Sequence, residues 1–292
     1  MTMRKQPQTL LEYLNEYAIT RPISDETARQ YRVAIGLYLR WRGSDDQPLD
    51  TLDELEVSTW LRDYGRTRAA GTVRSKRAYI MSLWRNAADD GYCDGPRRRV
   101  RLTPATAPPP VAWTIAEVDQ LITTCRRLKR WHPCGLRRSE YWELAIRCAW
   151  DTGLRWGDLI AMRVRDVPPD GSVFAVVQHK TRRVAICRLE SRTLDLLHAS
   201  LQKKPRELVV PWPSSGETFC AQFSRLVRKS GIRPGTWKWL RRSSGTDVEV
   251  QQWGAAARHL GHADGSRIAY VHYVDPVQLA QHGDRVWPRP LS

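Results

Sequence analysis

The sequence predicts a mainly α-helical protein of two domains, with a small antiparallel β-sheet in the second domain. Three observations indicate this fold class. Apolar residues return every three or four positions between Thr9 and Gly91, which is the spacing of amphipathic helices. A stretch rich in arginine and proline follows, and such a stretch cannot build a packed core. Further on, two short runs rich in β-branched residues, 173–177 and 184–189, interrupt a helical pattern.

The first domain is expected to contain four helices. The second of them begins after Ser24, with acidic residues in its first turn, and ends at Gly43. The third is expected at about 52–64 and the fourth at about 71–90. The fourth helix is rich in basic residues, namely Arg74, Lys76, Arg77 and Arg85. These fit either a solvated face or a face that meets phosphates.

A linker is expected between the two domains. The arginine run 96–101 is followed by the proline-rich tract 103–110, and this composition is typical of an extended connection. We therefore divide the chain into a helical domain at 1–101, a linker at 102–112 and a second domain at 113–292.

The second domain should begin with a helix capped by Thr114, because Glu117 lies at the capping-box position. Another helix is expected at about 140–150. The two β-rich runs are joined through 179–183, which predicts a hairpin. Helical patterns then resume at about 191–201, 218–229 and 237–249, and on either side of His262.

The charge of the chain favours a polyanionic partner. Lys and Arg number 47 and Asp and Glu 31, for a formal charge of +16, so nucleic acid is the leading candidate. The six cysteines form no C-x-x-C pair, so neither a zinc site nor a disulfide framework is indicated. No apolar run has the length of a membrane span. We expect a cytoplasmic protein that binds no membrane and no cofactor.

A set of basic side chains and one tyrosine in the second domain indicates phosphoryl transfer. Cleaving a phosphodiester with a protein hydroxyl places negative charge on the non-bridging oxygens, and fixed donors aimed at that charge lower the barrier. A guanidinium suits this role because it meets two oxygens at once and stays charged. The candidates are Arg155, Lys180, Lys238, Arg241, His262 and Tyr273.

Two of these candidates lie at turns. Gly153 is expected to end a helix, so that Arg155 lies at the start of the next one, beside free backbone N–H groups that favour a phosphate. Asp158 follows in the first turn and is expected to orient an arginine or to cap, rather than to act as an acid. Lys180 lies in the hairpin turn, from which a long side chain can donate a proton to a departing alkoxide.

The remaining basic candidates come from one helix and one glycine turn. Lys238 and Arg241 are three residues apart and therefore share a helix face. Arg242 competes with Arg241 but is expected to face solvent or the DNA backbone. Gly261 allows a tight turn that presents His262 inward.

In this order the motifs resemble the tyrosine recombinase (phage integrase) family. The likeness rests on the Thr152–Arg155 box, the hairpin lysine, the Leu240–Arg242 helix, the Leu260–His262 turn and the terminal tyrosine, and it extends to a helical core-binding domain at the N-terminus. It implies a two-domain clamp on double-stranded DNA, in which a homotetramer brings two DNA sites together.

The resemblance also implies the roles of the site residues. Arg155 and Arg241 would bind the scissile phosphate, with support from His262. Lys180 would protonate the 5′ oxygen, and Tyr273 would attack the phosphorus. The predicted function is site-specific recombination through a 3′-phosphotyrosyl intermediate, as in DNA integration or excision, without any cofactor.

The chain departs from the family pattern at two places. Lys238 stands where the family usually has histidine, as lysine can in type IB topoisomerases, so activity with a different pH dependence is expected. Tyr270 and Tyr273 both follow the histidine turn and lie one helical turn apart, so both are expected to be able to face the site. We choose Tyr273 because 272–276 matches the family's His-Tyr-hydrophobic-Asp-Pro ending, with Tyr270 as the reserve.

Two alternatives to a recombinase remain. Lys238 favours a relaxase similar to type IB topoisomerases, which nicks and reseals one duplex. Lys238 and the irregular tyrosine spacing also fit a non-catalytic DNA-binding protein on a recombinase scaffold. The motifs fix neither the DNA target sequence nor the biological role.

Overall fold

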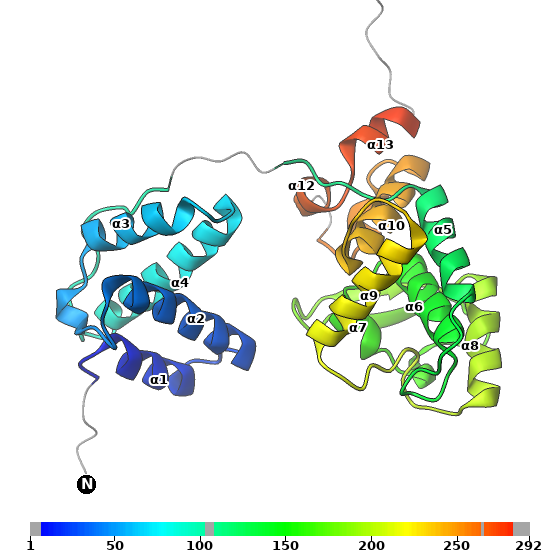
Figure 1. Cartoon of the computed structure of the whole chain (residues 1–292), viewed down its shortest axis with the longest axis horizontal. Helices are drawn as coiled ribbons and strands as arrows, with labels where there is room; N and C mark the ends of the chain where they lie inside the picture. The colour runs from blue at the N-terminus through cyan, green and yellow to red at the C-terminus, as the bar shows by residue number, and fades with distance from the viewer. Residues whose placement is uncertain (1–6, 103–107, 264–265, 283–292) are drawn as a thin grey trace, which may run out of the picture. The chain divides into compact units, whose positions relative to one another are not determined.

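The computed structural model describes residues 7–102, 108–263 and 266–282, so that residues 103–107 of the predicted linker lie outside the described part. By its internal contacts the chain divides into two units, Met1–Pro108 and Pro109–Ser292. Both units are mainly helical, and a two-stranded antiparallel sheet lies in the second (Figure 1). The predicted fold class is therefore confirmed.

The described part of the first unit contains the four predicted helices. They are α1 (Leu10–Thr20), α2 (Asp25–Arg42), α3 (Glu54–Gly65) and α4 (Ala70–Asp89), with a 3₁₀ turn at Leu49–Thr51. The Ser24 hydroxyl accepts the Thr27 N–H at 3.2 Å, and Gly43 takes the left-handed conformation at the other end of α2. The side chains of Trp60, Tyr13 and Tyr38 are almost fully buried in the core of this unit.

The basic residues of α4 do not form one face. Lys76 is buried, with its ammonium group 5.8 Å from the centre of the Tyr79 ring. Arg77 donates from Nε to the carbonyl of Val100 at 2.5 Å. Of the four, Arg74 and Arg85 are exposed, so these two can meet solvent or phosphates.

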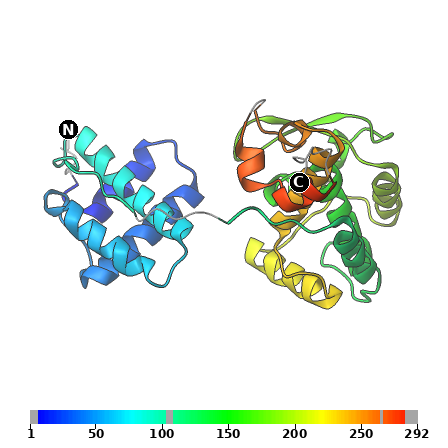
Figure 2. The same cartoon turned by 90° about the horizontal axis from the view of Figure 1, so that it is seen from above.

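The described part of the second unit contains eleven helices and strands. They are α5 (Ile115–Arg126), α6 (Arg138–Thr152), α7 (Trp156–Ile160), β1 (Phe174–Val177), β2 (Val184–Cys187), α8 (Ser191–Lys203), α9 (Gly216–Ser230), α10 (Trp237–Gln251), α11 (Ala255–His259), α12 (Ile268–His272) and α13 (Pro276–His282), with a 3₁₀ turn at Val164–Asp166. The strands pair with Phe174 opposite Cys187 and Val177 opposite Val184. Figure 2 shows the second unit from above, with α13 beside the short helix α12.

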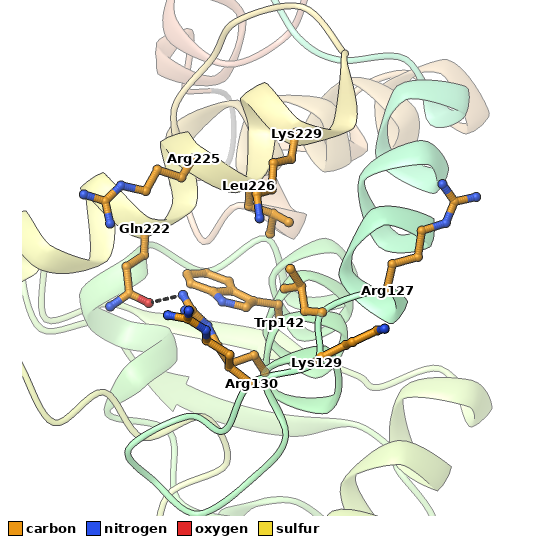
Figure 3. A pocket seen from close by; sticks show the side chains of 10 residues that line it. Arg127, Lys129, Arg130, Trp142, Gln222, Arg225, Leu226 and Lys229 are labelled. Carbon is orange, nitrogen blue, oxygen red and sulfur yellow. Dashed lines mark hydrogen bonds between the residues drawn. The ribbon is translucent and has the colours of Figure 1, made fainter.

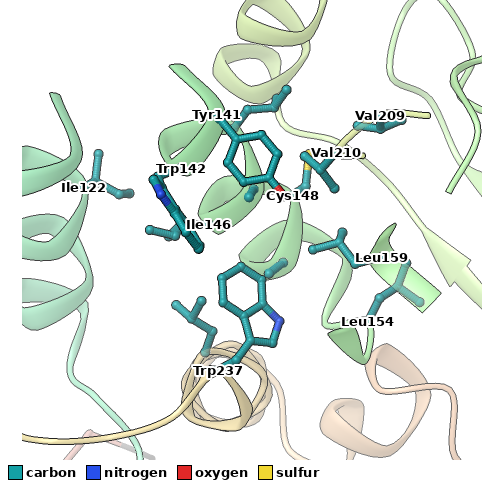
Figure 4. Close-up of a cluster of buried hydrophobic side chains, with 14 of the residues drawn as sticks. Ile122, Tyr141, Trp142, Ile146, Cys148, Leu154, Leu159, Val209, Val210 and Trp237 are labelled. Atoms are coloured by element: carbon teal, nitrogen blue, oxygen red, sulfur yellow. The ribbon is translucent and has the colours of Figure 1, made fainter. Parts of the chain in front are cut away.

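The core of the second unit is built around α6. Tyr141, Trp142 and Ile146 of this helix are buried, together with Trp237 from the start of α10 and Leu154 (Figure 4). Fully burying an aliphatic side chain such as Ile146 or Leu154 stabilises the fold by about 1.5–3 kcal/mol.

Three buried leucines connect this packing to the candidate site. Leu154, Leu240 and Leu260 are each at most 1% exposed. Each of them directly precedes a site segment, namely Arg155, Arg241 and the turn 261–262. The packing of the leucines thereby fixes where these three segments begin.

Candidate active site

Arg155 lies at the junction between α6 and α7. As predicted, α6 ends at Gly153, which has a φ of 58° in the left-handed region. A Cβ at this position would lie 2.7 Å from Nε2 of His259, so only glycine fits the turn. Arg155 then caps α7 and donates from Nη1 to the side-chain oxygen of Gln178 at 2.6 Å.

Arg241 is a buried cation on α10, with only 3% of its surface exposed. Its Nη1 donates to the carbonyl of Gly153, and its Nη2 donates to the carbonyl of Leu260 at 2.6 Å. Burial and the charge of Arg155 lower the pKa of Arg241 to about 10, so the group remains charged at neutral pH. Within the described residues neither Arg155 nor Arg241 is paired with a carboxylate. A buried cation without a counter-ion is costly, which favours an anionic ligand at this place.

Tyr273 lies among these cations, directly after α12. The Cζ atom of Arg241 is 4.8 Å from the centre of its ring, and the ammonium of Lys238 is 5.3 Å away. The His262 ring is 5.4 Å away, centre to centre. Burial opposes ionisation of the phenol, but the charges of Arg241, Arg155 and Lys238 outweigh it and lower the pKa of Tyr273. We call these five residues the Tyr273 cluster.

His262 is the neutral donor or acceptor of the Tyr273 cluster. It follows Gly261, which has a φ of 63° as the predicted turn requires. Its Nε2 atom lies 3.3 Å from Nη2 of Arg241. Burial and the charges of Arg241 and Arg155 lower the pKa of His262 to about 4, so the imidazole is uncharged at neutral pH.

Tyr270 lies in a different environment, contrary to the expectation that both tyrosines can face the site. Its hydroxyl donates to the carboxylate of Glu249 at 2.6 Å. Glu249 is 1% exposed and also accepts the backbone N–H groups of Gly254 and Ala256. Burial and this carboxylate raise the pKa of Tyr270 to about 12. The residue is thereby held away from the cations and in its protonated form.

Lys180 is exposed in the hairpin turn and makes no hydrogen bond or ion pair with any described residue. The structure therefore does not join it to the Tyr273 cluster. Asp158 is 5% exposed and accepts the backbone N–H of His179 at 2.7 Å. It thereby fastens the turn that carries Lys180 to α7, and its carboxylate accepts a backbone N–H instead of pairing with an arginine.

The sequence predicts that Arg242 faces solvent or the DNA backbone, but in the structure its guanidinium binds two backbone carbonyls. Its Nε donates to the carbonyl of His272 at 3.1 Å, and its Nη1 donates to the carbonyl of Val111 at 3.3 Å. Since His272 directly precedes Tyr273, Arg242 anchors the segment that carries the tyrosine. No local pattern shows this, because both acceptors are distant in the sequence.

Asp275 anchors the other side of Tyr273. It is 5% exposed, its Oδ2 accepts the N–H of Ala112 at 2.9 Å, and its Oδ1 accepts the N–H of Val277 at 2.9 Å. Its own N–H donates to the hydroxyl of Thr246. The bonds to His272 before Tyr273 and to Asp275 after it thus hold Tyr273 within the Tyr273 cluster of the same chain.

A second feature that the sequence reasoning missed is a basic pocket of about 470 Å³ between the start of α6, the preceding loop and α9 (Figure 3). Arg138 in this pocket donates to the Gln222 side chain at 2.6 Å. The pocket is lined by six cationic residues and no acidic ones, namely Arg127, Lys129, Arg130, Arg138, Arg225 and Lys229. The basic run at 126–130 is the sequence signal that could have indicated it.

A similar pocket of about 340 Å³ lies in the first unit. It is lined by the five arginines Arg62, Arg66, Arg68, Arg74 and Arg101. Clustered cations without acidic lining residues attract phosphate groups.

Within the described residues, no group of acidic, histidine and cysteine side chains could hold a metal ion. Each described helix is too short or too polar to cross a bilayer.

A helical unit followed by a unit that gathers arginines around a tyrosine defines the tyrosine recombinase class of proteins. The chain belongs to the phage integrase family: the model of that family matches residues 114–277, and the model of the phage integrase N-terminal SAM-like domain matches residues 10–91. No curated protein matches the sequence.

Solved structures of recombinases share this fold. A lambda integrase tetramer bound to a Holliday junction has 23% sequence identity and a TM-score of 0.69, covering 97% of this chain and 80% of that one. The XerH recombinase in a post-cleavage complex has 13% identity and a TM-score of 0.71, covering 93% and 83%. The Tn1549 transposon integrase with circular intermediate DNA has 14% identity and a TM-score of 0.68, covering 94% and 98%. At these identities the likeness establishes the fold.

Proposed function

We propose that this protein is a site-specific recombinase that cuts and rejoins double-stranded DNA through a 3′-phosphotyrosyl intermediate. The observation that carries this proposal is the position of Tyr273. Its phenol has a lowered pKa and lies beside two arginines that have no carboxylate partner among the described residues. An oxygen nucleophile beside unpaired guanidinium groups fits attack on a phosphodiester.

In the proposed reaction, Arg155 and Arg241 bind the non-bridging oxygens of the scissile phosphate, and neutral His262 adds one hydrogen bond. The Tyr273 oxygen releases its proton to solvent as it forms a bond to phosphorus, and the bond from phosphorus to the 5′ oxygen breaks. Lys180 supplies the proton that the 5′ oxygen takes up, which requires the exposed hairpin turn to approach the bound DNA. A 5′ hydroxyl from the partner duplex then attacks the phosphotyrosyl bond and releases Tyr273. Since this bond retains the energy of the phosphodiester, the exchange needs no nucleotide cofactor.

Lys238 supports the same chemistry with a different group from the usual histidine. Its ammonium lies over the Tyr273 ring, where a positive charge favours both the phenolate and a bound phosphate. The same residue also supports the second candidate function, a relaxase similar to type IB topoisomerases. The two functions differ in whether a particular DNA site and a second duplex are needed.

Double-stranded DNA is the proposed partner, held by the domains 1–101 and 113–292 with residues 102–112 as the linker. The basic pockets of the two units support this, because each offers several cations to a phosphate backbone. A homotetramer on two DNA sites is proposed because a structurally similar lambda integrase is a tetramer on a Holliday junction. The proposed location is the cytoplasm, at the nucleoid.

The test of this function begins with mapping the DNA sites that the protein binds. A duplex containing a mapped site, nicked near the cleavage point so that the released fragment is lost, should trap a covalent protein–DNA adduct. An adduct that forms only on the mapped site supports the recombinase. Relaxation of plasmids that lack the site supports the relaxase, and binding without any adduct supports a non-catalytic DNA-binding protein.

The basic pocket of the second unit gives a separate prediction about binding. Replacing Arg225 and Lys229 together by glutamine should weaken DNA binding and lower the slope of log K against log salt by about 1.8, since each phosphate contact contributes about 0.9. The loss should be similar on mapped and random duplexes, because phosphate contacts carry no sequence information. Filter binding at several salt concentrations measures it. The control is Arg192→Gln, the same type of substitution at an exposed residue of α8 outside both pockets. An unchanged slope in the double variant would contradict the assignment.

A further inference from the structure

Gln178 is a buried amide bonded to Arg155 of the Tyr273 cluster, and no sequence motif singles it out. It lies between β1 and the hairpin turn, two residues before Lys180, and none of its surface is exposed. A fully buried amide is retained only where its polar atoms are bonded, so its partners indicate its role.

The side chain of Gln178 connects the two arginines. Its Oε1 accepts from Nη1 of Arg155 at 2.6 Å and from the Thr181 hydroxyl at 2.9 Å. Its Nε2 donates to the carbonyl of Leu260 at 3.1 Å. That same carbonyl accepts from Nη2 of Arg241 at 2.6 Å. A continuous path of hydrogen bonds therefore runs from one guanidinium to the other.

No other common side chain of this length satisfies both neighbours at neutral pH. A guanidinium offers only donors and a backbone carbonyl only accepts, so the group between them must accept on one side and donate on the other. An amide does so without a charge of its own, which leaves the positive charge of Arg155 available to a phosphate.

The amide also has little freedom to move. The backbone of Gln178 donates to the carbonyl of Arg183 at 2.8 Å and accepts from the N–H of Arg182 at 2.9 Å. A Cβ on Gly261 would collide with the Gln178 side-chain nitrogen, so the glycine turn packs directly on the amide.

We propose, on the basis of the recombinase function proposed above, that Gln178 is a positioning residue for phosphodiester cleavage. It holds the Arg155 guanidinium in register with Arg241, so that both meet the same phosphate. It also fixes the base of the turn that carries Lys180. Because misplacing a reacting group by about 1 Å can slow a reaction about 10²-fold, the amide should act on the rate of cleavage rather than on DNA affinity.

Gln178→Met tests this, because methionine has a similar length and no amide. On saturating nicked substrate, single-turnover adduct formation should slow by about 10- to 100-fold. DNA affinity is measured in the Tyr273→Phe background. Adding Gln178→Met to that variant should change the affinity by at most about 3-fold, which is much less than the expected effect on the rate. Gln47→Met is the matched control, since Gln47 is equally buried in the first unit and donates to the Thr51 carbonyl at 3.0 Å. It should lower stability but leave the cleavage rate of bound DNA unchanged.

A double-mutant cycle with Arg155→Ala separates positioning from a general structural effect. If Gln178 acts through Arg155, then Gln178→Met should slow cleavage far less once the arginine is absent. Equal slowing in both backgrounds would overturn the proposal even if adduct formation by the wild-type protein supports the recombinase. Absence of an adduct with the wild-type protein would instead overturn the recombinase function itself.

Gln178→Glu provides a second readout if Gln178→Met does not fold. One oxygen of the introduced carboxylate still accepts from Arg155 and Thr181. The other oxygen has no hydrogen to donate to the Leu260 carbonyl, so that bond is lost. Protonation restores that donor and removes the extra negative charge. The cleavage rate of Gln178→Glu relative to the wild type should therefore rise as the pH is lowered, and a ratio independent of pH would contradict the proposed role.

Discussion

Replacing Tyr273 by phenylalanine is expected to abolish the covalent adduct with nicked DNA while DNA binding persists. The change removes the proposed nucleophilic oxygen and keeps the ring between Arg241, Lys238 and His262. Removing the nucleophile of an enzyme that works through a covalent intermediate lowers its rate on the order of 10⁶-fold. Denaturing gel electrophoresis of the trapped adduct measures the effect, and DNA affinity is measured in parallel.

Tyr270→Phe is the matched control, since it removes the same oxygen one helical turn away. The variant should still form the adduct, because the Tyr270 hydroxyl is bonded to Glu249 and not to the cluster. Its main effect should be a loss of stability of about 1–3 kcal/mol, as a buried carboxylate loses one of its donors. If the adduct survives Tyr273→Phe and disappears with Tyr270→Phe, the assignment of the nucleophile is wrong.

Local sequence patterns predicted the helix ends near the site, because the partners that determine them are close in the chain. Gly153 ends α6 in the left-handed conformation, and Thr114 and Glu117 form the expected capping box at the start of α5. These features depend on contacts within a few residues, and so a single sequence indicates them. The same local logic placed Lys180 in a turn and Arg241 on a helix.

The partners of the site residues could not be predicted in this way. Gln178 bonds to the carbonyl of Leu260, 82 positions away, and Arg242 bonds to that of Val111, 131 positions away. These carbonyls are backbone groups, which every residue carries, so no residue type in the sequence indicates them. The motif at 272–276 favoured Tyr273 over Tyr270, but no sequence pattern indicated the bond from Tyr270 to Glu249, 21 positions before it.

Replacing Arg241 by alanine should give the second large effect. With one of the two proposed phosphate-binding guanidinium groups gone, the charge that develops on the phosphate in the transition state would lose the more buried of its two proposed donors. Removing one such donor slows catalysis by about 10²–10³-fold. The rate is measured as single-turnover adduct formation on saturating nicked substrate. DNA affinity should change little, because one buried phosphate contact adds to the many surface contacts of a long duplex.

Arg241→Lys separates the role of charge from the role of geometry. Lysine keeps a positive charge, but a single ammonium cannot bond the carbonyls of Gly153 and Leu260 while it also meets a phosphate as a guanidinium does. If geometry matters, the lysine variant should cleave faster than Arg241→Ala and still at least about 10-fold more slowly than the wild type, since lysine cannot bind bidentately. Full activity with lysine would mean that the cluster acts through its total charge alone. The hydrogen-bonded path from Arg155 through Gln178 and Leu260 to Arg241 would then have no part in catalysis.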